Sequence, residues 1–256
     1  MTTPRSAHTP VGRRVYDASW VVCRALCLAL WGIRARFAEP MPEEGGLLLL
    51  ATHQSHLDPV LLGVSAPRRL SSLARSSLFR FRPFGWLIDA LDAVPIDRNA
   101  PGIAALKAII ARLRGGSAVI IFPEGTRTAT GTPAPLKNGF VTIARKARVP
   151  IMPVAIVGAW ECWPRTAWLP RPGRTRVEYG SLVHPDEIAR LDDEALVATC
   201  TRLLGELDRR GRAALHRRTR SPRRVLRAAV RTRPSRRTPL PADDRAGGAD
   251  AQGATG

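Results

Sequence analysis

The sequence predicts an α/β fold, a single domain with a mostly parallel mixed sheet flanked by helices. Between residues 47 and 180, short apolar runs of strand length alternate with segments of helical periodicity, and Gly or Pro bounds many of them. A length of 256 residues fits one such domain with appendages. In a sheet of this kind, ligands gather at the carboxyl ends of the strands.

The expected elements follow from these patterns in chain order. Strands are predicted at 47–52, 70–74, 93–96, 117–122, 151–157 and 176–179. Helices are predicted at 59–64, 84–91, 103–114, 138–146 and 192–210. The last helix has leucines at 196, 203, 204 and 207, which form an apolar face that can dock on the sheet.

The N-terminal segment 15–33 is mostly apolar, with tryptophans near both ends and arginines on both flanks. Asp17 and Arg24 lie inside it, and each such charge costs roughly 2.5–3.5 kcal/mol at the centre of a bilayer. The pattern favours a helix lying in the lipid headgroup region, while a spanning helix and a core helix of the soluble domain stay open. Residues 1–14 are polar and are predicted to be disordered.

The C-terminal segment 209–256 contains fourteen Arg and three acidic residues, and so carries 11 of the 19 net positive charges. It has too few apolar residues to fold, so we predict a disordered tail. The tail can serve solubility, hold an anionic membrane, or bind nucleic acid. The predicted domains are therefore 1–38 (disordered start plus membrane-associated helix), 39–208 (catalytic domain) and 209–256 (tail).

The four cysteines show no C-x-x-C spacing, and no His lies near a Cys in a zinc-ligand pattern. A metal site and a disulfide framework are therefore not expected. This cysteine usage is typical of a reducing, cytosolic setting.

A His and an Asp five residues apart follow the apolar strand predicted at 47–52, namely His53 and Asp58. Ser55 and Asp58 also match a capping box, with Pro59 in the first helical turn. In this first interpretation, Asp58 only caps a helix. In a second interpretation, Asp58 accepts a hydrogen bond from one imidazole nitrogen of His53 and leaves the other nitrogen as a general base. Spacing alone leaves both interpretations open.

Cations and a carboxylate follow other predicted strands. The loop Phe122-Pro123-Glu124-Gly125-Thr126-Arg127 combines a carboxylate, a guanidinium and a glycine that lets backbone approach a ligand. Arg75 and Arg98 each come just after a short strand. Together the three arginines indicate an anionic substrate, although each alone is also explained by a turn or a surface ion pair.

These residues together resemble a known family, the glycerolipid acyltransferases of the 1-acylglycerol-3-phosphate (lysophosphatidate) acyltransferase type. The resemblance is carried by His53 to Asp58 (H-x-x-x-x-D), Val94-Pro95-Ile96-Asp97-Arg98, residues 122–127, and Val149-Pro150-Ile151-Met152-Pro153-Val154, in that order. Pro83-Phe84-Gly85-Trp86 between them is also similar. The resemblance covers residues 47–157 and leaves the termini outside.

The resemblance implies an O-acyltransferase of phospholipid biosynthesis. His53, oriented by Asp58, would deprotonate the free hydroxyl of a lysophospholipid, which attacks the thioester of acyl-CoA or acyl-carrier protein. Glu124, Gly125 and Thr126 would shape the acceptor site, with backbone donors near Gly125 for the oxyanion. Arg98 and Arg127 would hold the acceptor phosphate, and Arg75 stands where relatives often have Lys.

No cofactor is implied beyond the acyl thioester substrate. The implied partners are this donor, the lysophospholipid acceptor and an anionic membrane surface, at the cytoplasmic face of the cell membrane with peripheral or monotopic attachment. Another acceptor, such as a lyso-ornithine lipid or a glycolipid, is the alternative within this class. A basic nucleic-acid-binding protein is the alternative from a different class, but no recognition-helix or stacking-aromatic pattern supports it.

Overall fold

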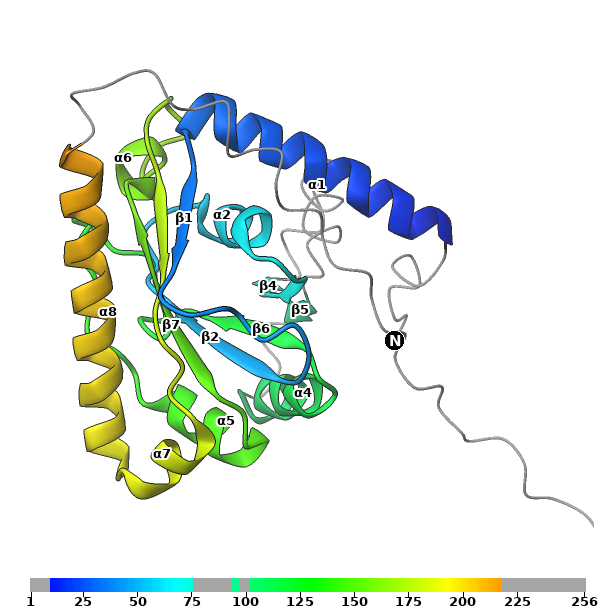
Figure 1. The fold of residues 1–256 in the computed structure, drawn as a ribbon, viewed down its shortest axis with the longest axis vertical. Helices are drawn as coiled ribbons and strands as arrows, with labels where there is room; N and C mark the ends of the chain where they lie inside the picture. The colour runs from blue at the N-terminus through cyan, green and yellow to red at the C-terminus, as the bar shows by residue number, and fades with distance from the viewer. Residues whose placement is uncertain (1–9, 76–93, 97–101, 218–256) are drawn as a thin grey trace, which may run out of the picture.

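The computed structural model describes residues 10–75, 94–96 and 102–217. Its centre is a six-stranded sheet in the order β1-β8-β7-β2-β6-β3 (Figure 1). Neighbours are parallel except for β7 and β8, which are antiparallel, so the predicted mostly parallel mixed sheet is confirmed. The strands are β1 (Arg34–Phe37), β2 (Leu47–Ala51), β3 (Leu70–Ser71), β6 (Ala118–Ile121), β7 (Ile151–Val157) and β8 (Arg176–Tyr179).

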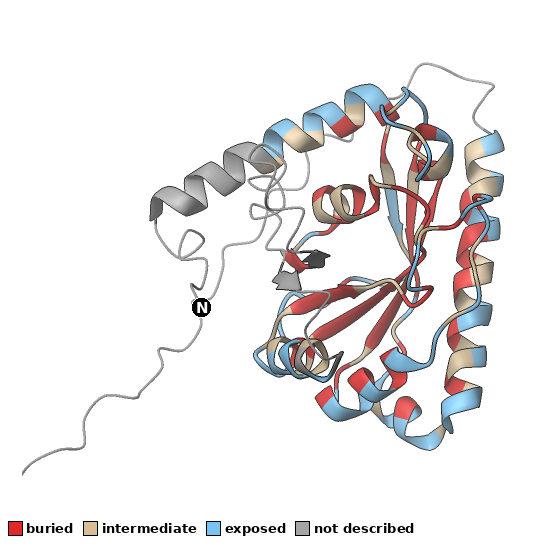
Figure 2. Ribbon diagram, turned by 180° about the vertical axis from the view of Figure 1, so that it is seen from behind, coloured by how far each residue is buried: buried red, intermediate tan, exposed pale blue. Residues whose placement is uncertain are grey.

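Helices cover both faces of this sheet. Leu47 and Leu49 of β2 face a cluster that includes α2 (Asp58–Ser65), whereas Leu48 and Leu50 face a cluster on the opposite side. That second cluster is built with α4 (Gly102–Arg114), α5 (Gly139–Ala147), α7 (Pro185–Arg190) and α8 (Asp193–His216). Every residue of β2 is fully buried, and Figure 2 shows the buried residues concentrated in the sheet. Because β2 contributes buried leucines to both clusters, it is the central strand of the core.

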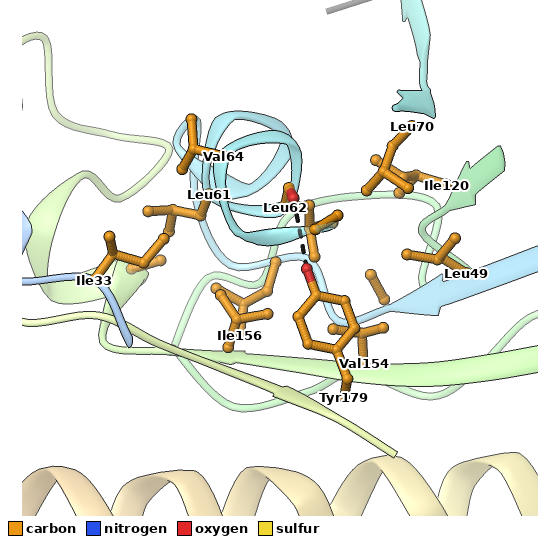
Figure 3. Packing of buried hydrophobic residues seen from close by; sticks show 14 of the residues in the cluster. Ile33, Leu49, Leu61, Leu62, Val64, Leu70, Ile120, Val154, Ile156 and Tyr179 are labelled. Atoms are coloured by element: carbon orange, nitrogen blue, oxygen red, sulfur yellow. Dashed lines mark hydrogen bonds between the residues drawn. The ribbon is translucent and has the colours of Figure 1, made fainter. Parts of the chain in front are cut away.

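On the α2 side, the core closes around an aromatic ring. Figure 3 shows Tyr179 of β8 pointing toward α2, where its hydroxyl approaches the Leu62 carbonyl oxygen at 3.5 Å. The same hydroxyl lies 2.8 Å from the Ser65 hydroxyl. These contacts fix the position of α2, and therefore of the turn that precedes it, relative to the sheet.

Several expected elements differ from the structure. The strand predicted at 70–74 is two short strands, β3 and β4 (Leu73–Arg75), and β4 pairs with β5 (Val94–Ile96) in a separate two-stranded sheet. The sequence patterns missed β1, α6 (Ala159–Cys162) and α7, which have only four to six residues each. Elements this short carry too little periodicity to be recognised. The helix predicted at 84–91 lies outside the described residues.

The N-terminal helix, α1 (Pro10–Trp31), packs on the domain through one face and exposes apolar residues on another. Its inner face packs on α2, with the Trp20 Nε1 donating to the Gly63 oxygen at 3.1 Å and Arg24 donating to the Val64 oxygen at 2.6 Å. Cys27 on that face is buried, while Val22 and others on the outer face are exposed. Among the described helices, none is both long and apolar enough to cross a membrane.

The folded unit extends past the boundaries predicted at 38 and 208. The strand β1 pairs with β8 inside the main sheet, and α8 continues to His216 with Gly211 buried. The helix α1 begins inside the segment 1–14 that was predicted to be disordered, because its inner face finds a partner in α2. Residues 218–256, which hold most of the predicted tail, lie outside the described residues.

Candidate active site

The pairing of His53 with Asp58, one of two interpretations that spacing left open, is present in the structure. His53 lies two residues beyond the end of β2, and its Nδ1 is 2.8 Å from the Asp58 Oδ2. The same oxygen accepts from the backbone N–H groups of Gln54 at 2.6 Å and Ser55 at 2.7 Å. Since Oδ2 is an acceptor for three groups, the imidazole proton belongs on Nδ1. This tautomer leaves Nε2 with a lone pair, as a general base requires.

Asp58 therefore performs both tasks that the spacing left open. Its carboxylate reaches back to the Ser55 N–H, as a capping-box carboxylate does, and also orients the His53 ring. The predicted N-cap is wrong, because α2 begins at Asp58 with Leu57 as its N-cap. The Ser55 hydroxyl instead accepts from the Leu57 N–H at 3.1 Å and donates to the Trp163 carbonyl at 2.6 Å.

Asp58 is fully buried, while the His53 side chain keeps 20% of its surface exposed. Burial raises the pKa of the Asp58 carboxyl, and the hydrogen bonds from His53 and the two backbone N–H groups oppose this rise. The His53 ring stacks on Phe122, with ring centroids 4.0 Å apart and an interplanar angle of 18°. The imidazole is thus held on one edge by a carboxylate and on one face by an aromatic ring, which leaves little freedom to rotate.

Glu124 anchors the loop after β6 to the backbone of His53. Its Oε1 accepts from the His53 N–H at 2.9 Å, and its Oε2 accepts from the Ala134 N–H at 3.0 Å. The Thr128 N–H donates to the His53 carbonyl at 2.9 Å. Burial raises the pKa of the Glu124 carboxyl, and the two N–H donors lower it in part. Both carboxylate oxygens are engaged by backbone, so Glu124 shapes the site by positioning His53.

Gly125 and Thr126 of the predicted loop are exposed, whereas Arg127 is half-buried. Gly125 has a φ of 73° in the left-handed region, and a Cβ there would lie 2.9 Å from the Lys137 Nζ. The Gly125 N–H donates to the Phe122 carbonyl at 3.1 Å, so the oxyanion donor expected from this residue is already engaged. Lys137, one of only three lysines in the chain, brings to this loop a cation that the strand-end pattern missed.

Arg127 lies within electrostatic range of His56. Burial lowers the pKa of His56, and the Arg127 charge lowers it further. The His56 ring also packs against Trp163, with centroids 5.1 Å apart. Of the other predicted phosphate ligands, Arg75 ends β4 in register with Ile96 of β5. Arg98 lies outside the described residues.

A contact that no spacing predicts supports the loop from α8. The Gly131 carbonyl accepts from the Gln54 Nε2 at 3.2 Å and from Arg212, 81 residues further along the chain, at 2.5 Å. Arg212 is held in turn by Asp208 on the same helix, at 2.7 Å. The Gly131 carbonyl therefore joins the loop after β6 to Gln54, which follows His53, and to α8.

The arrangement can therefore do general-base chemistry on a substrate group that approaches the His53 Nε2. Arg127, near His56, and Lys137, near Gly125, add cations to the neighbouring turn and loop. Among the described residues, no three His, Cys, Asp or Glu side chains are grouped closely enough to hold a metal ion.

Comparison with known proteins decides the family. A family model described as Acyltransferase matches residues 32–157. The 1-acyl-sn-glycerol-3-phosphate acyltransferase of Bacillus subtilis (strain 168) is 31% identical over 177 residues, which cover 68% of this chain and 85% of that protein. The chain belongs to the 1-acyl-sn-glycerol-3-phosphate acyltransferase family. The resemblance read from the motifs is confirmed.

Two further relatives of this acyltransferase fit the assignment. The enzyme of the same name from Pseudomonas aeruginosa PAO1 is 34% identical over 176 residues, covering 64% of this chain and 66% of that protein. The crystal structure of the 1-acyl-sn-glycerophosphate (LPA) acyltransferase PlsC from Thermotoga maritima aligns with a TM-score of 0.66 at 22% identity. The alignment covers 85% of this chain and 87% of the Thermotoga maritima chain, and it shows that the two proteins share a fold.

Proposed function

We propose that this acyltransferase moves a fatty acyl group from a thioester donor to the free hydroxyl of 1-acylglycerol 3-phosphate, giving phosphatidate. The observation that carries the proposal is the His53–Asp58 pair, whose 2.8 Å bond leaves Nε2 as the available base. The acceptor follows the names of the relatives from Bacillus subtilis and Pseudomonas aeruginosa.

The reaction needs no nucleophile from the protein. The Nε2 of His53 takes the proton of the acceptor hydroxyl as its oxygen attacks the thioester carbonyl. The tetrahedral intermediate collapses with breakage of the carbon–sulfur bond, and the imidazolium returns the proton to the departing thiolate. The Asp58 carboxylate stabilises the imidazolium while it exists. The Ser55 hydroxyl, nearby in sequence, is engaged with the Trp163 carbonyl and plays no part in this scheme.

Arg127 is the described side chain that we assign to the acceptor phosphate. A guanidinium matches phosphate oxygens in a bidentate geometry, and Arg127 lies beside His56 in the turn that carries His53. We propose the same role for Arg75 and Arg98 on the strength of the family motifs.

We further propose that the enzyme works at the cytoplasmic face of the cell membrane, held there peripherally or monotopically. Support comes from the outer face of α1, where Val21, Val22, Leu26 and Leu30 are each more than two-fifths exposed. Acyl-CoA and acyl-carrier protein are both thioesters that suit the mechanism, and either can serve as the donor.

The proposal is tested by acyl transfer from a panel of thioester donors to a panel of lysolipids, with release of the free thiol as the readout. We expect 1-acylglycerol 3-phosphate to be the preferred acceptor. Preference for a lyso-ornithine lipid or a glycolipid would overturn the acceptor assignment, and hydrolysis without acyl transfer would overturn the reaction. Arg127→Ala should impair phosphate-bearing acceptors more than neutral ones, and an equal loss would remove its role.

A further inference from the structure

Large apolar side chains that face solvent are concentrated on two elements of the described structure. Of seven such residues, six lie on α1 and on the loop between α6 and β8. On α1 they are Val21, Val22, Leu26 and Leu30, and on the loop they are Trp168, 88% exposed, and Leu169, 63% exposed. We call these six residues the apolar rim. Isolated exposed apolar residues are ordinary, whereas a concentration of them marks a contact surface.

The loop that carries Trp168 and Leu169 is held in shape by its own hydrogen bonds. The Arg171 N–H donates to the Cys162 carbonyl at 2.7 Å, which closes the base of the loop. Near the tip, the Ala167 carbonyl accepts from the Trp163 Nε1 at 3.1 Å. The two exposed side chains are therefore displayed by a defined backbone.

The end of this loop is joined to the C-terminal end of α1. The Trp31 Nε1 donates to the Arg171 carbonyl at 2.9 Å, and the Gly173 N–H donates to the Leu30 carbonyl at 3.0 Å. Leu30 is itself a rim residue, so the loop that carries Trp168 and Leu169 is attached to α1 at a residue of the rim. Figure 1 shows α6, the start of this loop, at the same end of the molecule as the C-terminal end of α1.

The beginning of the loop is joined to the catalytic turn. Trp163 accepts the Ser55 hydroxyl on its carbonyl at 2.6 Å, and its ring packs against His56. The loop therefore runs from the neighbours of His53 to the end of α1, with the exposed Trp168–Leu169 tip between these two anchors.

The charge of the loop is uniformly positive. Between α6 and β8, residues 163–175 contain Arg165, Arg171 and Arg174 and no acidic residue. All three arginines are exposed. Guanidinium groups around an apolar tip match a surface that has phosphate groups above hydrocarbon.

We propose that the Trp168–Leu169 tip is a second membrane-inserting element, which enters the headgroup region of an anionic bilayer alongside the exposed face of α1. It rests on the membrane location proposed above and extends it to a particular surface and orientation. A Trp side chain suits the membrane–water interface because its ring is apolar and its N–H is polar. Because Trp163 at the beginning of the loop contacts Ser55 and His56, insertion of the tip holds the turn that carries His53 near the membrane in which a lysophospholipid acceptor resides.

The test compares vesicle binding by the full chain and three variants of it. In the tip variant, Trp168→Ser and Leu169→Ser are combined; in the helix variant, Leu26→Ser and Leu30→Ser are combined. The matched control is Ile103→Ser on α4, an apolar residue with 65% exposure outside the rim. Flotation or sedimentation uses vesicles of phosphatidylcholine with and without about one-third phosphatidylglycerol.

We expect the tip variant to bind anionic vesicles about tenfold more weakly or worse, and the control to bind as the unchanged chain does. Binding should also fall as salt rises, since the arginines contribute electrostatically. Unchanged binding by the tip variant with weakened binding by the helix variant would overturn the tip and leave the membrane location standing. Unchanged binding by both variants would overturn the apolar rim as the attachment surface, and absence of binding by the unchanged chain would overturn the membrane location itself.

Acyl transfer to a short-chain lysolipid below its micellar concentration separates this proposal from the proposed function. The tip variant should retain its turnover of this monomeric acceptor while losing turnover of acceptor embedded in vesicles. Equal losses on both forms would place the tip in the active site and overturn a docking role. Absence of transfer by the unchanged chain would instead count against the proposed function.

Discussion

The loop between α6 and β8 connects the turn from His53 to Asp58 with the apolar rim, and these two regions are built on opposite principles. In the turn, polar groups are buried and engaged: the Asp58 Oδ2 alone accepts three hydrogen bonds, and its residue has no exposed surface. In the rim, a Trp with 88% of its surface exposed has no apolar cover in the described chain.

The difference shows which parts of the molecule need precise interatomic distances for their function. Proton transfer depends on distances of tenths of an ångström, so the turn is fixed by directional hydrogen bonds. Attachment to a fluid surface depends on apolar area and charge, which tolerate changes of geometry. Substitutions in the turn should therefore affect catalysis and spare vesicle binding, and those in the rim should do the reverse.

The largest effect is expected for His53→Ala. Loss of the general base should lower kcat by about 10²–10⁴-fold, while vesicle binding stays unchanged because His53 makes no contact with the rim residues. Turnover is measured by thiol release and binding by flotation on the same preparation. Near-normal turnover of the variant would refute the base assignment, and a parallel loss of vesicle binding would refute the division between turn and rim.

Asp58→Asn should lower kcat roughly 10²-fold or more and keep the fold. The amide oxygen has to stay at the Oδ2 position because two backbone N–H groups donate to it, but it is uncharged and no longer stabilises the imidazolium that forms when His53 takes the proton. A steady-state pH profile alongside the parent enzyme checks this. If the variant loses stability in proportion to its activity, the role of Asp58 is structural, as a cap, and the orienting role is wrong.

Glu124→Gln tests whether the loop after β6 helps to hold the His53 turn in position. A Gln has one acceptor oxygen where the carboxylate offers two, so either the His53 or the Ala134 N–H loses its partner. We expect about tenfold lower kcat and about 1–3 kcal/mol lower stability near neutral pH. Glu161→Gln on α6, at an exposed position, is the control and should change neither quantity.

The pH dependence of that stability difference has a definite sign. Burial raises the pKa of Glu124 in the folded chain, so the folded state holds its proton to higher pH than the unfolded state does. Stability contributed by this residue therefore falls as pH rises from the ordinary pKa of Glu through the raised value. Since Gln does not titrate, the advantage of the parent over the variant should shrink across that interval in denaturant titrations. A growing advantage would contradict the raised pKa.

The parts of this molecule that could be predicted from sequence are those encoded locally. The strand at 151–157 and the strand at 176–179 have the predicted bounds, because a continuous apolar run or a short alternation defines each of them. Spacing also offered the pairing of His53 with Asp58 as one of two interpretations, since five residues just span the turn between a strand and a helix.

The parts that could not be predicted depend on contacts distant in sequence. Glu124 was expected to shape the acceptor site directly, yet its two oxygens bind backbone N–H groups that only the folded loops bring together. The sequence left open whether α1 packs on the domain or meets lipid, because its partner Gly63 is 43 residues away. No local pattern distinguishes an apolar helix face that meets protein from one that meets lipid.

Arg212→Met is expected to have the smallest effect on catalysis. It tests whether the precisely positioned region around His53 extends to α8. The guanidinium joins Asp208 of α8 to the Gly131 carbonyl, which also holds Gln54, the residue after His53. Met keeps much of the apolar stem and removes the donors, so kcat should fall about two- to fivefold and stability by about 1–2 kcal/mol. Thiol-release kinetics and denaturant titration measure the two quantities.

Arg202→Met on the same helix is the matched control for Arg212→Met. Arg202 is paired only with Glu206 at an exposed i,i+4 position, so its loss should change stability by less than about 0.5 kcal/mol and leave kcat unchanged. A positioning role for Arg212 further requires that kcat falls while KM for the acceptor stays constant. Equal effects of the two substitutions would show that α8 does not help to position His53. The precisely positioned region would then consist of the turn and the loop after β6 only, and α8 would serve to cover the sheet.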